Sequence, residues 1–213
     1  MVTVTQRMPG PPRGSSLPFP AQHRILLLLQ RRLERSTFEF IRKRLPQLSQ
    51  SKGWDCAEKL ELHMAFRELE QEFRACPTAD WVSRPKGGFG RLRADIISIR
   101  HAAVHRQPQS QRRLRQQLTS ASEYATVWLG DRQCGLEIRQ CQALVNDIFD
   151  DWRERCCRLR SISMARMDYD GGRCSKNTLL EATRRLTDKI DHDCIEQVDR
   201  VLHASFPPPC ANI

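Results

Sequence analysis

Near the middle of this 213-residue chain, an arginine and two histidines lie close together: Arg100, His101 and His105. An arginine guanidinium can hold a phosphate through two parallel hydrogen bonds. A histidine can take up or release a proton near neutral pH. Together such side chains could bind a phosphodiester and move a proton to or from it. We therefore treat Arg100, His101 and His105 as candidate catalytic residues.

The candidate residues lie in a strongly basic stretch, residues 84–115. This stretch holds nine Lys or Arg residues and a single acid, Asp95. Closely spaced cations attract polyanions, so such a stretch is typical of nucleic-acid binding. The arginines that we expect to contact nucleic-acid phosphates are Arg91, Arg93, Arg106, Arg112, Arg113 and Arg115.

The basic charge of the whole chain is unevenly distributed. The formal net charge is +10. Residues 1–115 carry 22 basic and 10 acidic side chains, net +12, whereas residues 116–213 carry 13 and 15, net −2. This asymmetry indicates that one face binds a nucleic acid, an anionic membrane or an acidic protein. A compositional bias toward Arg, which supplies 29 of the 35 basic residues, is the alternative explanation.

Apolar residues recur with helical spacing along most of the chain, and strand-like alternation never extends beyond a few residues. The sequence therefore predicts an all-α fold, a bundle of five or six helices. The candidate residues fall on the last turns of one helix, with Leu92, Ile96, Ile99 and Ala103 on its inward face. The helices are expected at about residues 21–45, 55–76, 89–106, 110–129, 131–160 and 178–203.

Two tails flank the predicted domain. Residues 1–20 are rich in Pro, Gly and Ser and poor in apolar side chains, so we expect them to be disordered. Residues 21–205 form a single α-helical domain, with a basic helix pair at 84–129. Residues 206–213 contain three consecutive prolines and form a Pro-rich tail.

The segment Arg100-His101-Ala102-Ala103-Val104-His105 resembles the signature of the HEPN superfamily (higher eukaryotes and prokaryotes nucleotide-binding). That signature is an Arg, four further residues and a His, with a polar residue straight after the Arg. Family members are α-helical bundles, often dimers, and the active ones cleave RNA without a metal. The resemblance implies that His105 is the general acid/base, that Arg100 holds the scissile phosphate, and that His101 orients either group. It also implies RNA as a partner, a homodimer, and neither a metal nor another cofactor.

Other interpretations of this segment stay open. Arg100 and His105 lie about 140° apart on an ideal helix, so they converge only if the helix loosens or if two subunits each supply one. His101 and His105 have the spacing of a helical metal pair, but no third ligand is evident. His105 could simply cap the end of the helix, and the arginines could form a solvated face.

A second function class also fits the sequence. The long amphipathic helices favour a non-catalytic α-helical protein-interaction module that pairs with itself or with an acidic partner. Such a module predicts exposed apolar side chains along its helices. A ribonuclease instead predicts that Arg100 and His105 are exposed and converge in one groove. Whether the chain is an enzyme stays open at this point.

The nine Cys residues show neither Cys-x-x-Cys nor zinc-finger spacing. Several, such as Cys134 and Cys141, have helix-core spacing, where a thiol packs as a small apolar group. We expect reduced thiols and a cytoplasmic or nuclear protein. The first 33 residues lack acids, as a mitochondrial presequence does, but five prolines would interrupt its helix. The longest apolar run, Ile25–Leu29, is too short to cross a bilayer, so no transmembrane segment is expected.

The run from Ile96 to Asp131 also resembles uncharacterised fungal proteins. Automated naming assigns some of these to the cytochrome c subunit of ubiquinol–cytochrome c reductase. A c-type haem requires Cys-x-x-Cys-His, and no Cys in this chain has that spacing. We therefore expect no haem, whatever name the relatives carry.

Overall fold

The computed structural model describes residues 16–75, 89–169 and 175–206. Within these ranges the backbone is helical almost throughout and contains no strand, so the all-α prediction is confirmed. The predicted tails fall mostly outside the described residues. The elements are α1 (Phe19–Arg44), α2 (Pro46–Lys52), η1 (Ala57–Lys59), α3 (Leu62–Ala75), α4 (Phe89–Val104), α5 (Gln111–Glu123), η2 (Tyr124–Trp128), α6 (Arg132–Tyr169) and α7 (Lys176–Ser205).

The short helix α2 makes seven α-helices among the described residues. Leu45 precedes a proline and takes an extended φ of −134°, which ends α1. Pro46 then occupies the first position of α2, where its missing N–H is not needed. Gly53 closes α2 with a φ of +66°, a left-handed conformation that suits glycine. One proline therefore ends one helix and begins the next.

The helix expected to begin near residue 55 begins seven residues later. Residues 57–59 form only the 3-10 turn η1, and α3 starts at Leu62. Asp55 instead pairs with Lys59, with 2.6 Å between Oδ2 and Nζ. Between the two elements Leu60 has an extended backbone and a buried side chain, so the chain turns there to enter the core.

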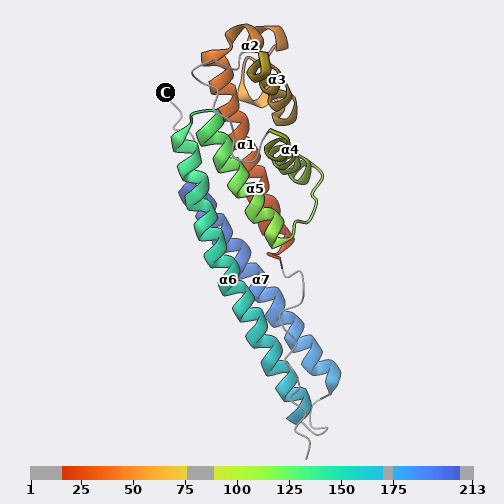
Figure 1. Ribbon diagram of the computed structural model, residues 1–213. Coiled ribbons are helices and arrows are strands. Elements are labelled where there is room, and N and C mark those ends of the chain that lie inside the picture. The colour runs from red at the N-terminus through yellow and green to blue at the C-terminus, as the bar shows by residue number, and fades with distance from the viewer. Residues whose placement is uncertain (1–15, 76–88, 170–174, 207–213) are drawn as a thin grey trace, which may run out of the picture.

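The helices divide the molecule into two regions (Figure 1). We call the first region the body: residues 16–151, without the undescribed segment, and residues 192–206. The second, the arm, comprises residues 152–169 of α6 and 175–191 of α7, which extend together beyond the body as an antiparallel pair. The body contains α1 to α5, and the two long helices connect it to the arm.

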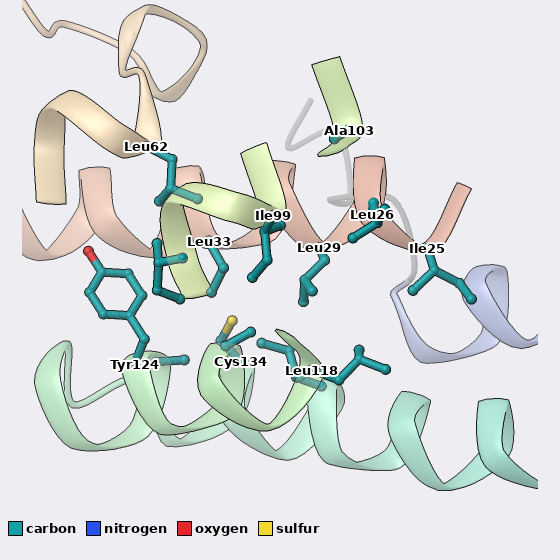
Figure 2. Packing of buried hydrophobic residues seen from close by; sticks show 14 of the residues in the cluster. Ile25, Leu26, Leu29, Leu33, Leu62, Ile99, Ala103, Leu118, Tyr124 and Cys134 are labelled. Atoms are coloured by element: carbon teal, nitrogen blue, oxygen red, sulfur yellow. The ribbon is translucent and has the colours of Figure 1, made fainter. Parts of the chain in front are cut away.

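The hydrophobic core fills the body. Figure 2 shows α1 contributing Ile25, Leu26, Leu29 and Leu33, which face side chains from α4, α5 and α6. At one end of this core three aromatic rings, Phe66, Phe73 and Tyr124, cluster around Trp128. The ring of Phe66 stacks on Trp128 at 5.1 Å between centroids, and Phe73 meets it edge-on at 4.8 Å. Tyr124 completes the cluster and shares a hydrogen bond with Thr37, 3.1 Å between the two hydroxyl oxygens.

The π-helical turn η2 sets the start of α6. The backbone N–H of Leu129 donates to the carbonyl of Tyr124, five residues earlier, in place of the usual four. The turn brings Thr126 against Gly135 in the first turn of α6, where a Cβ on Gly135 would overlap the Thr126 methyl group. Gly135 therefore allows the two segments to approach closely.

Candidate functional site

Helix α4 places the candidate residues at its C-terminal end. Its inward face is the predicted one: Leu92, Ile96, Ile99 and Ala103 are all buried. Arg100 and His101 lie on the helix, and His105 follows its last residue. The next residue, Arg106, has a φ of +51°, so the chain reverses there toward α5. The helix therefore ends one residue before His105, the last of the candidate residues.

Asp95, the single acid of the basic stretch, is a buried structural hub. Its carboxylate accepts hydrogen bonds from Arg113 Nη1 at 2.6 Å, Gln116 Nε2 at 2.9 Å and Ser120 Oγ at 2.6 Å. All three donors come from α5. A buried carboxylate is stable only when it is paired and hydrogen-bonded, so this network holds α4 and α5 together.

Arg100 points toward the start of α3. Its Nη2 lies 3.0 Å from Oε2 of Glu61, and about a quarter of its side chain is exposed. The neighbouring groups respond to this environment. Burial lowers the pKa of His63, and the Arg100 charge lowers it further, against the opposing effect of Glu61. Burial also raises the pKa of Glu34, although a hydrogen bond from Gln30 and the Arg100 charge act in the other direction.

His101 and His105 lie together on the exposed surface. Their ring centroids are 4.4 Å apart, and the His105 backbone N–H donates to the His101 carbonyl at 3.0 Å. Among the described residues, no hydrogen bond, ion pair or ring contact joins Arg100 to His105. The structure thus brings the two histidines together and directs Arg100 to Glu61, as five-residue spacing on a helix would suggest.

The six arginines expected to bind nucleic acid fall into two groups. Arg113 is held by Asp95, Arg93 lies 3.5 Å from Glu70, and Arg115 donates to Asn146 at 2.8 Å. Arg115 also lies over the Phe149 ring, 5.6 Å from its centroid. These three contribute to packing between helices. The other three, Arg91, Arg106 and Arg112, make no such contact among the described residues; they are exposed, as Arg93 and Arg115 are too.

The set of arginines in this stretch that have no partner in the described part of the protein is therefore smaller than the sequence indicates. It contains Arg91, Arg106 and Arg112, which join no ion pair among the described residues, and of these Arg106 directly follows His105. The partner acids, Glu61 just before α3 and Glu70 within it, lie outside the basic stretch. Arg84 and Lys86 fall outside the part of the chain that the structure describes.

Two observations in the described regions concern metal ions and thiols. There, no group of three or more His, Cys, Asp or Glu side chains is placed to hold a metal ion. Cys134 and Cys141 are buried, as their spacing predicts, and burial raises the pKa of each thiol to about 12. Such thiols are poor nucleophiles at neutral pH. In the same regions no helix combines the length and the apolar character needed to cross a bilayer.

The arm carries a feature that sequence spacing did not reveal. Four large apolar side chains near its end are about half exposed: Ile162, Met164, Leu180 and Leu186. Between the two helices, polar side chains meet instead, with Ser163 Oγ 2.9 Å from Thr183 Oγ1. The exposure could not be foreseen, because the periodicity of each helix does not show where its partner helix ends.

Known proteins do not identify the chain. No protein-family model, curated protein or solved structure matches it. The resemblance of residues 100–105 to the HEPN superfamily therefore stays a prediction, and the candidate functions follow from the geometry of this chain.

Proposed function

We propose that this protein is a helical interaction module whose arm binds an acidic amphipathic helix of another protein. The observation that carries this proposal is the half-exposed set Ile162, Met164, Leu180 and Leu186 at the end of the arm. Clustered apolar side chains on a surface mark interaction sites more often than isolated ones do. Exposed apolar side chains along the helices are also what the interaction-module hypothesis predicts.

The interior of the arm supports this proposal. In a helical hairpin that is stable on its own, apolar residues fill the interface and polar residues face the solvent. Near the end of this arm the order is reversed, because Ser163 and Thr183 meet at the interface while Ile162 and Leu186 are exposed. A partner that covers the apolar residues would restore the usual arrangement.

Helix geometry places Ile162 and Leu186 on the same side of the arm. Each precedes a residue of the interface, Ser163 or Thr187, and equivalent positions of antiparallel helices face the same side. With Ser163 opposite Thr183, the two side chains are offset by about two residues, or roughly 3 Å along the axis. Ile162 and Leu186 thus lie near each other on one side of the arm.

The charge of the arm indicates an acidic partner. Between residues 158 and 189, the described side chains include six cations and two acids, Glu181 and Asp188. Glu154 pairs with Arg158 and Glu181 with Arg185 along their own helices. The cations that join no ion pair among the described residues are Arg160, Arg166, Arg184 and Lys189. Carboxylates beside an apolar stripe would complement this surface.

The test uses a fluorescent synthetic helix of about five turns, with Leu on one face and Glu on the other. We expect saturable binding that weakens about 10- to 100-fold when Ile162→Gln and Leu186→Gln are combined, since two buried aliphatic contacts are lost. The control combines Leu136→Gln and Leu144→Gln, which change equally exposed side chains of α6 within the body. Equal affinity for wild type and the Ile162/Leu186 variant would overturn the proposal.

RNA binding at the end of α4 is the second candidate function. The observation that favours it is the exposed contact between His101 and His105, next to the exposed Arg106. Cleavage would further require Arg100 to leave Glu61 and reach the phosphate beside His105. Because Glu61 is more than half exposed, this ion pair is inexpensive to break.

The experiment for this candidate is degradation of labelled single-stranded RNA in EDTA by wild type and His105→Ala. Loss of a general acid/base lowers cleavage by about 10²- to 10⁴-fold. Products with cyclic-phosphate ends from wild type alone would support a metal-independent endoribonuclease of the HEPN type. Equal inactivity would leave RNA binding without cleavage, which Arg106→Gln with Arg112→Gln would weaken and added salt would suppress.

A further inference from the structure

A groove runs along the outer face of α1, between η1 and the C-terminal end of α7. Its volume is about 800 Å³, within the range of small-molecule sites. The elements that line it, α1, η1 and the end of α7, lie in the body, far along the molecule from the end of the arm (Figure 1). Its apolar lining comes from Leu27 and Leu28 of α1 and from Leu202 and Phe206 of α7 and its end.

Arginines line the same groove. Arg24, Arg31 and Arg35 follow one another at seven and four residues along α1, so they share one face over roughly 16 Å. Arg24 pairs with Asp199 and Arg35 with Glu39. Arg31 joins no ion pair among the described residues. Because Arg31 and Arg35 are four residues apart on a helix, their guanidinium groups can act on one anion.

Arg32 adds a second sign of an anion site. Its Nη2 pairs with Glu137, and its guanidinium lies over the Phe206 ring at 5.5 Å from the centroid. Its Nε is buried and meets no hydrogen-bond acceptor among the described residues. A buried donor without an acceptor carries a free-energy cost. A ligand oxygen at the edge of the groove would remove that cost.

The acids that face the groove limit which anions fit. Asp199 is already paired with Arg24, and Glu58 is exposed. Glu34 lines the groove as well, and burial raises its pKa, against a hydrogen bond from Gln30 that lowers it. A polyanion such as RNA would meet these carboxylates along its length. A ligand with one anionic group avoids them.

We infer that this groove binds a single-chain amphipathic anion, an aliphatic chain ending in a carboxylate. The chain lies on Leu27, Leu28, Leu202 and Phe206, and the carboxylate lies between Arg31 and Arg35. The dimensions favour such a ligand over a protein partner, because stable protein interfaces bury about 800 Å² on each side. The groove, formed by three turns of α1 and two short flanking segments, offers a much smaller area. This site is independent of the arm and of the proposed function.

The experiment is calorimetric titration of the full chain with dodecanoate below its micelle concentration. We expect saturable binding of one dodecanoate per chain. Dodecanol, which keeps the aliphatic chain without the charge, and butanoate, which keeps the charge without the long chain, should each bind at least ten-fold more weakly. Dodecanol binding as tightly as dodecanoate would overturn the inference, as would the absence of saturable binding.

Variants locate the site. Arg31→Gln combined with Arg35→Gln should weaken dodecanoate binding at least ten-fold. Its matched control combines Arg42→Gln and Arg44→Gln, which remove the same charge from α1 outside the groove. The arm variant with Ile162→Gln and Leu186→Gln should bind dodecanoate like wild type, and its failure to do so would reveal adsorption to exposed apolar side chains. Equal binding by the Arg31/Arg35 variant and its control would refute the assignment.

Discussion

The body and the arm share two long helices but bury different side chains between them. Within the body, α6 and α7 bury Val145 and Val198, whose exposed fractions are 1% and 0%. Within the arm, the corresponding contact joins the hydroxyl groups of Ser163 and Thr183. The body therefore supplies its own hydrophobic stabilisation, whereas the end of the arm gains little from burial. The same pair of helices is part of the hydrophobic core at one end and carries exposed apolar side chains at the other.

The largest expected difference between the two regions concerns Trp128 and Ile162. Trp128 is almost fully buried against Phe66 and Phe73, so Trp128→Ala should lower the free energy of unfolding by about 3–5 kcal/mol. Ile162→Ala should change it by no more than about 0.5 kcal/mol. Urea denaturation followed by circular dichroism measures both. A loss of similar size for the two variants would mean that the arm is stabilised as the body is.

A second effect tests whether polar contacts in the body differ from those in the arm. Asp95→Ala removes a buried acceptor of three hydrogen bonds and should cost about 3 kcal/mol in unfolding free energy. Asp150→Ala, which alters an exposed carboxylate of α6, is the control and should stay within about 0.5 kcal/mol of wild type. If Asp95→Ala unfolded at the wild-type urea concentration, the hub would not hold α4 to α5.

The next effect concerns the place where α6 begins. A methyl group on Gly135 would overlap Thr126, so Gly135→Ala should destabilise the body by about 1–3 kcal/mol. Gly90 has open space around the corresponding position, and Gly90→Ala in α4 should be neutral or stabilising. Thermal unfolding distinguishes the two substitutions. A stabilising effect at both positions would show that η2 adjusts easily.

The smallest expected effect is a dependence of the free energy of unfolding on pH, which arises in the body. Burial and the Arg100 charge lower the pKa of His63 in the folded protein below its unfolded value of about 6.5. The unfolded chain therefore takes up this proton first, and the unfolding free energy falls as pH drops from about 7 through the folded pKa. His63→Gln should flatten this part of the pH profile. An unchanged profile in that variant would assign the dependence to other groups.

Much of the fold could be predicted from the sequence because helix burial is a local, periodic property. The inward face of α4 follows from the spacing of Leu92, Ile96, Ile99 and Ala103, and all four are buried. The start of a second helix, α2, at Pro46 was harder to foresee. A proline marks the end of one helix and the beginning of another equally well.

The surroundings of the candidate residues could not be predicted, because they depend on distant partners. Glu61 meets Arg100 across 39 residues of sequence, and no local pattern connects them. In the sequence Asp95 is only an isolated acid, because its hydrogen-bond donors lie on α5 and no local pattern connects them to it. The groove on α1 needs η1 and the end of α7, which are separated by most of the chain. Charge counts thus indicated a basic segment but not which cations remain available.

The cysteine thiols of the body and of the arm differ in burial, so their rates of alkylation report on different motions of the protein. Cys134 and Cys141 are sealed in the body, whereas Cys156 lies partly exposed in the arm. An alkylating reagent would therefore label Cys156 before Cys134 and Cys141. The two sealed thiols would react only after the body opens. Mass spectrometry of one labelling time course would separate these rates without any mutation.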